Sequence, residues 1–183
     1  DGVILPPARV VPRKGIEHSL ALVRSLGDPR YKLVISHGAG DEGLDYFEFL
    51  QEHAHNRGVD LRIVAGRVDR KRVNNGDGKK VYTLWDIYPH ADLVTYPSLY
   101  EGFGNAFLEA VYFKKPILVN RYSVYQTDIE LLGFDCVVMD QYLTRRAIEQ
   151  VRLLLHDENR RREMVDKNYR LATKHFSFRV IRQ

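Results

Sequence analysis

The stretch at positions 97–110, PSLYEGFGNAFLEA, places two carboxylates around a glycine-rich turn. Glu101 lies in the turn, and Glu109 follows about one helical turn into a run of helical character. Asn105 is the natural N-cap of that helix, whose free N–H groups would attract an anion. The glycines of the turn would let such a ligand lie close to the backbone. The stretch therefore predicts an anion site with two acidic groups beside it.

A ligand that is anionic at one end and rich in hydroxyl groups elsewhere would explain this combination. A nucleotide sugar has this chemistry, because its ribose and hexose donate hydrogen bonds that carboxylates accept, at about 1.5–3 kcal/mol each. We expect Glu109 to bind the ribose and Glu101 the hexose. Cations for the diphosphate are available in ARVVPRKG, which supplies Arg9 and Lys14 just before another predicted helix. Arg13, in the same segment, is expected to be a solvated neighbour.

Short apolar runs alternate with amphipathic stretches along most of the chain. Runs rich in Val, Ile and Leu predict strands covered on both faces at 3–5, 31–36, 60–66, 91–97, 116–120 and 135–140. Amphipathic stretches predict helices at 15–26, 42–57, 80–90, 105–114, 122–132 and 144–155. This alternation predicts an α/β domain with a Rossmann-like, doubly wound parallel sheet in three layers. Its ligand would bind beyond the carboxyl ends of the strands.

Two stretches depart from the alternation. Residues 66–80 are polar and basic and contain Asn-Asn-Gly-Asp-Gly, which predicts a long exposed loop. Residues 157–183 have helical spacing and no strand after them, so we expect a terminal helix with only another domain left to pack against. The predicted organisation is a nucleotide-sugar-binding domain at 1–156 followed by a C-terminal helix at 157–183.

The composition is that of an ordinary globular protein, with 44% apolar and 28% charged residues among 183. No apolar run is long enough to span a bilayer, and no signal-peptide pattern is visible. The single Cys136 excludes an intramolecular disulfide and favours a cytoplasmic protein. The net charge of +4 favours anionic partners and leaves a membrane contact open. Nucleic-acid binding is not indicated, because the basic residues belong to no recognisable module.

A second motif, Gly38-x-Gly40-x-x-Gly43, follows a predicted strand and precedes a predicted helix, as a dinucleotide fingerprint does. Against this interpretation, acidic residues at 41 and 42 would occupy the first helical turn, where the phosphates should lie. The next strand is followed by Arg67 rather than by an acidic partner for a ribose, although an arginine could suit the 2′-phosphate of NADP. An NAD(P)-binding oxidoreductase domain therefore stays an alternative.

Four segments are similar to one known family. EGFGNAFLE resembles the E-x7-E signature of the retaining glycosyltransferases of family 4, the glycosyl transferases group 1, which have the GT-B fold. ARVVPRKGIEHSLALV resembles the family's opening Arg-x4-Lys-Gly segment, with Arg9 and Lys14 at the matching positions. HADLVTYPSLYEGFG is similar to the strand that delivers the signature, and KHFSFRVIRQ to the closing helix. The similarity covers nearly the whole chain, in the order of the C-terminal, donor-binding half.

The resemblance implies a hexosyltransferase that uses a nucleotide diphosphate sugar, retains the anomeric configuration and needs no metal or other cofactor. Arg9 and Lys14 would neutralise the leaving diphosphate, and Glu101 would act at the transferred sugar. The segment AGRV would meet the base. The implied donor-binding residues are Glu109, Gly102, Phe103, Gly104, Asn105, Gly66 and Arg67.

The chain also departs from the family pattern. Lys114 stands where relatives usually carry a glycine, and a left-handed conformation there would cost about 1 kcal/mol. NRYSVYQTDIE, at 120–130, replaces a Gly-Gly-x-x-E stretch. We expect an N-terminal GT-B domain, which this sequence does not include, as a partner, and expect the chain alone to bind nucleotide but to transfer sugar poorly. A non-catalytic nucleotide-binding module is the other alternative.

Overall fold

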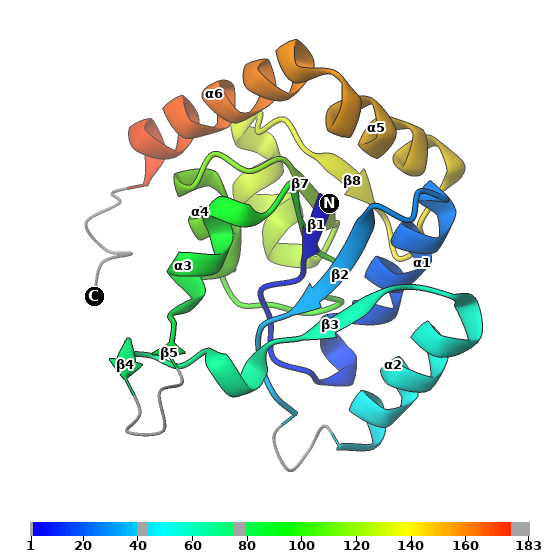
Figure 1. The fold of residues 1–183 in the computed structure, drawn as a ribbon. Coiled ribbons are helices and arrows are strands. Elements are labelled where there is room, and N and C mark those ends of the chain that lie inside the picture. The colour runs from blue at the N-terminus through cyan, green and yellow to red at the C-terminus, as the bar shows by residue number, and fades with distance from the viewer. Residues whose placement is uncertain (1, 40–43, 75–79, 177–183) are drawn as a thin grey trace.

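The computed structural model describes residues 2–39, 44–74 and 80–176, and its centre is a six-stranded sheet (Figure 1). All neighbouring strands are parallel, in the order β3-β2-β1-β6-β7-β8. Ile4 of β1 pairs with Leu33 of β2 on one side and with Leu93 of β6 on the other. The strands are β1 (Gly2–Leu5), β2 (Tyr31–Ile35), β3 (Leu61–Ile63), β6 (Leu93–Tyr96), β7 (Ile117–Asn120) and β8 (Val137–Met139). The predicted parallel sheet is confirmed, with one strand at each predicted place.

Helices cover both faces of this sheet and bury two separate apolar clusters, which gives the three layers expected (Figure 1). The first cluster joins one face of the sheet to α1 (Ile16–Leu26), α2 (Leu44–Arg57) and α5 (Arg145–His156). The second joins the other face to α4 (Asn105–Tyr112) and to the short helix α3 (Leu84–Ile87). Strand side chains alternate between the clusters, since Ile4 belongs to the first and Leu5 to the second.

Three segments differ from their predicted form. The helix expected at 80–90 is reduced to α3 and a 3-10 turn (Tyr88–His90) that contains Pro89. The helix expected at 122–132 is a π-helical turn (Tyr125–Ile129) followed by a 3-10 turn (Glu130–Leu132) that ends at the left-handed Gly133. The loop expected at 66–80 contains a hairpin of β4 (Val73–Asn74) and β5 (Lys80–Val81), held by antiparallel pairing that its turn-rich composition did not reveal.

The C-terminal helix α6 (Glu158–His175) packs within this domain. It lies against α4 and α5, and it places Met164 in the first apolar cluster and Ala172 in the second. The expectation that it had only another domain to contact was therefore wrong, because its buried face packs against helices of this domain. Among the described residues no helix, α6 included, is long and apolar enough to cross a membrane.

Candidate active site

The strand order creates one place where loops from opposite halves of the sheet meet. From β1 the chain proceeds through β2 to β3 in one direction, whereas β6, β7 and β8 follow in the other direction. The segments that leave β1 and β6 at their carboxyl ends therefore lie next to each other, and ligands of open α/β sheets bind at such a switch point. These segments contain the two motifs predicted to work together, ARVVPRKG and EGFGN.

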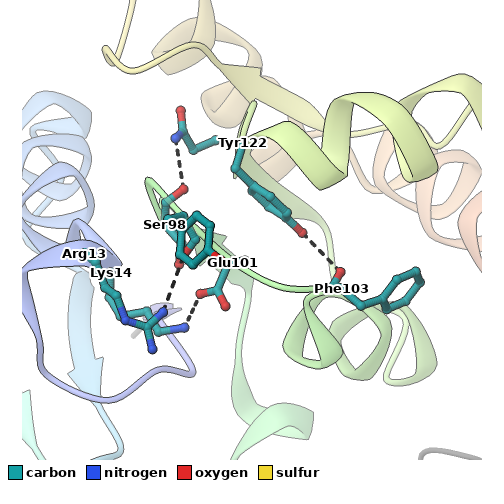
Figure 2. Close-up of polar contacts among 8 residues, drawn as sticks. Arg13, Lys14, Ser98, Glu101, Phe103 and Tyr122 are labelled. Atoms are coloured by element: carbon teal, nitrogen blue, oxygen red, sulfur yellow. Dashed lines mark hydrogen bonds and ion pairs between the residues drawn. The ribbon is translucent and has the colours of Figure 1, made fainter.

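Lys14 and Glu101 form an ion pair at this switch point, although 87 residues separate them (Figure 2). Each side chain is 11% exposed, so the pair is largely withdrawn from solvent. The ammonium group of Lys14 also lies 5.9 Å from the ring centre of Tyr96. Gly15 makes the approach of the two loops feasible: its φ is 61°, and a Cβ there would lie 2.7 Å from the carbonyl oxygen of Pro97.

Arg9 and His37 extend the cationic side of the site. Arg9 is exposed on the segment after β1, and His37 follows β2 with its Nδ1 2.9 Å from the hydroxyl of Ser36. Burial lowers the pKa of His37, and the positive charges of Arg9 and Lys14 lower it further, which keeps the ring neutral near pH 7. In the described ranges, no group of three or more His, Cys, Asp or Glu residues could hold a metal ion.

The glycine turn, residues 101–105, presents backbone N–H groups at the start of α4. Helix α4 begins at Asn105, and the N-cap is Gly104, with φ 88° and ψ 61°. The prediction of Asn105 as N-cap was wrong, because the left-handed Gly104 completes the turn one residue earlier. Within the part of the chain that the structure describes, no hydrogen bond engages the N–H groups of residues 102–105. These groups are available to an anion.

Two tyrosines pack behind the turn. Tyr122 is 3% exposed, and its hydroxyl donates to the carbonyl oxygen of Phe103 at 3.5 Å (Figure 2). A Cβ at Gly104 would lie 2.5 Å from the hydroxyl oxygen of Tyr122 and 3.3 Å from that of Tyr96. Burial and, next, the charge of Glu101 raise the pKa of both tyrosines, so both hydroxyls stay protonated. The packing of the two tyrosines therefore strongly favours glycine at position 104.

The front of the turn carries an exposed aromatic side chain. Phe103 is 37% exposed and meets Phe176 edge to face, with 5.2 Å between the ring centres. Phe176 follows directly after α6 and also packs near Phe134. The turn thus touches the end of a helix that lies far from it in the sequence.

Glu109 is one helical turn into α4 and is held by α3 and by the 3-10 turn that follows it. Its Oε2 accepts a hydrogen bond of 3.0 Å from the hydroxyl of Tyr88, a residue with no exposed surface. Burial raises the pKa of Glu109 above its usual 4.5, and hydrogen bonds from Tyr88 and Trp85 offset part of that shift. These hydrogen bonds therefore fix the orientation of the carboxylate.

Gly66 and Arg67 lie apart from this cluster, on a 3-10 turn (Ala65–Arg67) after β3, and both are exposed. Arg67 borders a mainly apolar cavity of about 550 Å³ whose wall includes Val34, Tyr82 and Ile87. The loop after β2 comes close by, since a Cβ at Gly38 would lie 3.8 Å from the Cβ of Ala65. Gly40 and Gly43 of the alternative fingerprint lie outside the described residues.

Comparison with known proteins decides the family. A family model described as "Glycosyl transferases group 1" matches residues 1–171. The chain belongs to the group 1 glycosyl transferases. It is 34% identical over 155 residues to a mannosylglucosylglycerate synthase of Petrotoga mobilis, covering 75% of this chain and 35% of that protein. It is 30% identical over 203 residues to the enzyme of the same name from Thermotoga maritima, covering 96% of this chain and 45% of that protein.

Solved structures share the fold, and one of them is described as a group 1 glycosyl transferase. The structure of Anabaena Alr3699/HepE in complex with UDP superposes with a TM-score of 0.79 at 16% identity, over 99% of this chain and 46% of that chain. The C-terminal domain of LpcC from Francisella tularensis superposes with a TM-score of 0.74 at 18% identity, over 96% and 86% of the two chains. The chain thus has the fold of the C-terminal domain of GT-B glycosyltransferases and spans less than half the length of the Petrotoga and Thermotoga relatives.

The resemblance in family and fold is confirmed, and it replaces the oxidoreductase alternative. Lys14 and Glu101 are brought together, and Arg9 and Lys14 both act on His37. Glu109 lies on α4, and Gly66 and Arg67 lie apart on the turn after β3. Sequence reasoning missed the residues that support the site from behind: Tyr88, Tyr96, Asn120 and Tyr122. A polar residue at the end of a buried strand, as in ILVN, is a signal that could have found one of them.

Proposed function

We propose that this chain is the donor-binding part of a retaining glycosyltransferase that moves a hexose from a nucleotide diphosphate sugar to an acceptor hydroxyl without a metal. The observation that carries the proposal is the Lys14–Glu101 pair at the switch point, beside the free N–H groups of residues 102–105. This arrangement places a cation and backbone amides where they could bind a diphosphate, and a carboxylate where it could accept hydrogen bonds from sugar hydroxyls. The second GT-B domain would supply the acceptor site.

The described residues divide between the two ends of the donor. Lys14, Arg9 and the N–H groups of the glycine turn would stabilise the charge that develops on the leaving diphosphate, as preorganised donors do. Glu101 would accept hydrogen bonds from the hexose and Glu109 from the ribose. The turn of Gly66 and Arg67 would meet the base, beside the apolar cavity of Arg67.

The comparisons narrow the donors to be tested. The two sequence relatives are named for making mannosylglucosylglycerate, and solved structures of HepE hold UDP or UDP-glucose. We therefore propose a mannosyl or glucosyl donor, because the product in the relatives' name contains both sugars and a HepE structure holds UDP-glucose.

A thermal-unfolding panel tests the function directly. The chain is measured with UDP, ADP, GDP, their glucose and mannose conjugates, and NADP, each with and without EDTA. A ligand at 100 times its dissociation constant adds about 2.7 kcal/mol of stability. We expect one nucleoside diphosphate and its conjugate to stabilise the chain, unchanged by EDTA. Stabilisation by NADP alone, or by none of the ligands, would contradict the proposal.

Donor affinity should fall in acid because of Glu109. A carboxyl whose pKa is raised above 4.5 protonates early as the pH falls, and the protonated form loses acceptor capacity for the ribose. Tyr88→Phe removes a hydrogen bond that lowers this pKa, so the midpoint of the affinity loss should move to higher pH.

The control is Tyr46→Phe, which removes a comparable tyrosine–glutamate hydrogen bond, to Glu17, between α1 and α2. Calorimetric titration with the best nucleotide sugar between pH 4 and pH 8 would measure both midpoints. An identical midpoint in wild type and Tyr88→Phe would show that Glu109 does not bind the donor.

A further inference from the structure

Asn120 is the last residue of β7, and both polar atoms of its buried side chain are engaged. The side chain is 2% exposed. Its Nδ2 donates to the carbonyl oxygen of Ser98 at 2.9 Å, and its Oδ1 accepts from the N–H of Gln141 at 2.9 Å. Only one orientation of the amide fits a carbonyl on one side and an N–H on the other. The side chain is therefore fixed.

The contact with Ser98 holds the segment that delivers Glu101. Ser98 is buried, and its hydroxyl has no hydrogen-bond partner among the described residues, so the carbonyl is the polar group by which this residue is held. On the opposite side, the N–H of Leu99 donates to the carbonyl of Arg13 at 2.9 Å. The backbone just before Glu101 is thus fastened between the loop after β1 and the end of β7.

The contact with Gln141 extends this support to the loop after β8. Gln141 has φ 61°, a left-handed conformation that residues other than glycine rarely adopt. Its N–H is held by Asn120 at that position. One side chain therefore connects the segments that follow β6, β7 and β8, all at the carboxyl edge of the sheet where the donor would bind.

We propose that Asn120 is a positioning residue for the donor site. It fixes the backbone at Ser98, so that Glu101 meets Lys14 and the N–H groups of the glycine turn face the diphosphate. Asn120 acts through this backbone and not on the donor, because it is buried and its Nδ2 and Oδ1 each hold a backbone group. The inference rests on the proposed function and adds to it a residue from the stretch where the chain departs from the family pattern.

Asn120→Asp tests this role, and Asn168→Asp is its matched control. Asn168 on α6 is 1% exposed, donates to the carbonyl of Asp135 at 2.6 Å and accepts from the N–H of the same residue at 2.7 Å. In both variants an oxygen replaces the amide N–H and faces a carbonyl oxygen, so both should lose stability. Only Asn120 supports the glycine turn.

The measurement is calorimetric titration of wild type and both variants with the nucleoside diphosphate and nucleotide sugar that bind best. We expect at least a tenfold loss of affinity for both ligands in Asn120→Asp and a change below twofold in Asn168→Asp. Equal effects in the two variants would overturn the proposal, because a general loss of stability would then explain them. The milder pair Asn120→Ser and Asn168→Ser gives the same comparison if a carboxylate prevents folding.

Hydrogen exchange supplies a readout that needs no ligand. The amide of Leu99 should exchange faster in Asn120→Asp than in wild type, and it should be unchanged in Asn168→Asp. Unchanged exchange in both variants would overturn the role of Asn120 even if the chain binds donors. A wild-type chain that binds no donor, with Leu99 exchange raised in Asn120→Asp alone, would refute the proposed function and leave the placement of the loop by Asn120 standing.

Discussion

Replacing Lys14 by alanine should weaken the binding of a nucleoside diphosphate about 100-fold. A charge-assisted hydrogen bond contributes about 1.5–3 kcal/mol, and without Lys14 the ligand would also face the unpaired carboxylate of Glu101. Lys14 neutralises Glu101 at a site where each side chain is 11% exposed. Without the ammonium group, the carboxylate of Glu101 would repel the diphosphate across a poorly hydrated space. Calorimetric titration would measure the loss.

The control for this prediction is Lys114→Ala. Lys114 pairs with Asp166 between α4 and α6, but the two side chains are 51% and 46% exposed, and such pairs contribute little. Its loss should leave donor affinity unchanged. Glu101→Gln, by contrast, should not weaken the binding of the bare diphosphate, because it releases Lys14 from its ion pair. The same substitution should weaken the binding of the nucleotide sugar. If Glu101→Gln and Lys14→Ala lowered diphosphate affinity alike, the pair would have only a structural role.

Gly104→Ala should destabilise the fold by about 2–4 kcal/mol, the sum of a left-handed alanine and an overpacked contact. The φ of 88° is unfavourable for any residue with a Cβ, and the new methyl group would lie 2.5 Å from the hydroxyl oxygen of Tyr122. Because Tyr122 is 3% exposed, its ring cannot simply swing into solvent. For a chain of this size the melting temperature should fall by about 5–15 °C.

Two further substitutions separate the causes. Gly133→Ala carries the same backbone strain at φ 83°, but its Cβ would meet nothing within 4 Å. Its melting temperature should therefore fall by less than that of Gly104→Ala. Adding Tyr122→Phe to Gly104→Ala removes the clashing oxygen and should restore part of the stability. An equal loss in Gly133→Ala and Gly104→Ala would show that the tyrosine does not constrain the turn.

The regular parts of the fold followed from the sequence because their signals are local. Each buried strand is a short run of branched apolar residues, such as ILVN at β7, and this composition needs no tertiary information. The conformation of Lys114 did not follow from the sequence: a left-handed residue with a Cβ is unfavourable there, yet its φ is 50°.

The irregular parts depend on packing that no local pattern states. The stretch 122–132 has helical spacing, yet it forms a π-helical and a 3-10 turn, with Tyr125 and Ile129 buried against α4 and β7. Similarly, Asn105 is a good N-cap by type, but the cap is decided by the left-handed Gly104 that the tyrosines require.

The sequence predicted the charged residues of the candidate site but not the residues that support them. Arg9, Lys14 and Glu101 could be identified because charge type and motif spacing are visible in the sequence. Asn120 and Tyr122 act through the backbone of a loop that is distant in sequence, and that relation exists only once β6 and β7 are paired.

The switch point also makes donor binding a probe of how this chain folds. Within β1 to β3 and within β6 to β8, each strand pairs with the strand next to it in the sequence. The pairing of β1 with β6, by contrast, closes a long loop. Contacts of large sequence separation carry the entropy cost of closing that loop and tend to form slowly. Because Lys14 and Glu101 lie on opposite sides of this joint, the proposed nucleotide site can form only after the two halves have docked. Recovery of nucleotide binding after dilution from denaturant would therefore time that docking step.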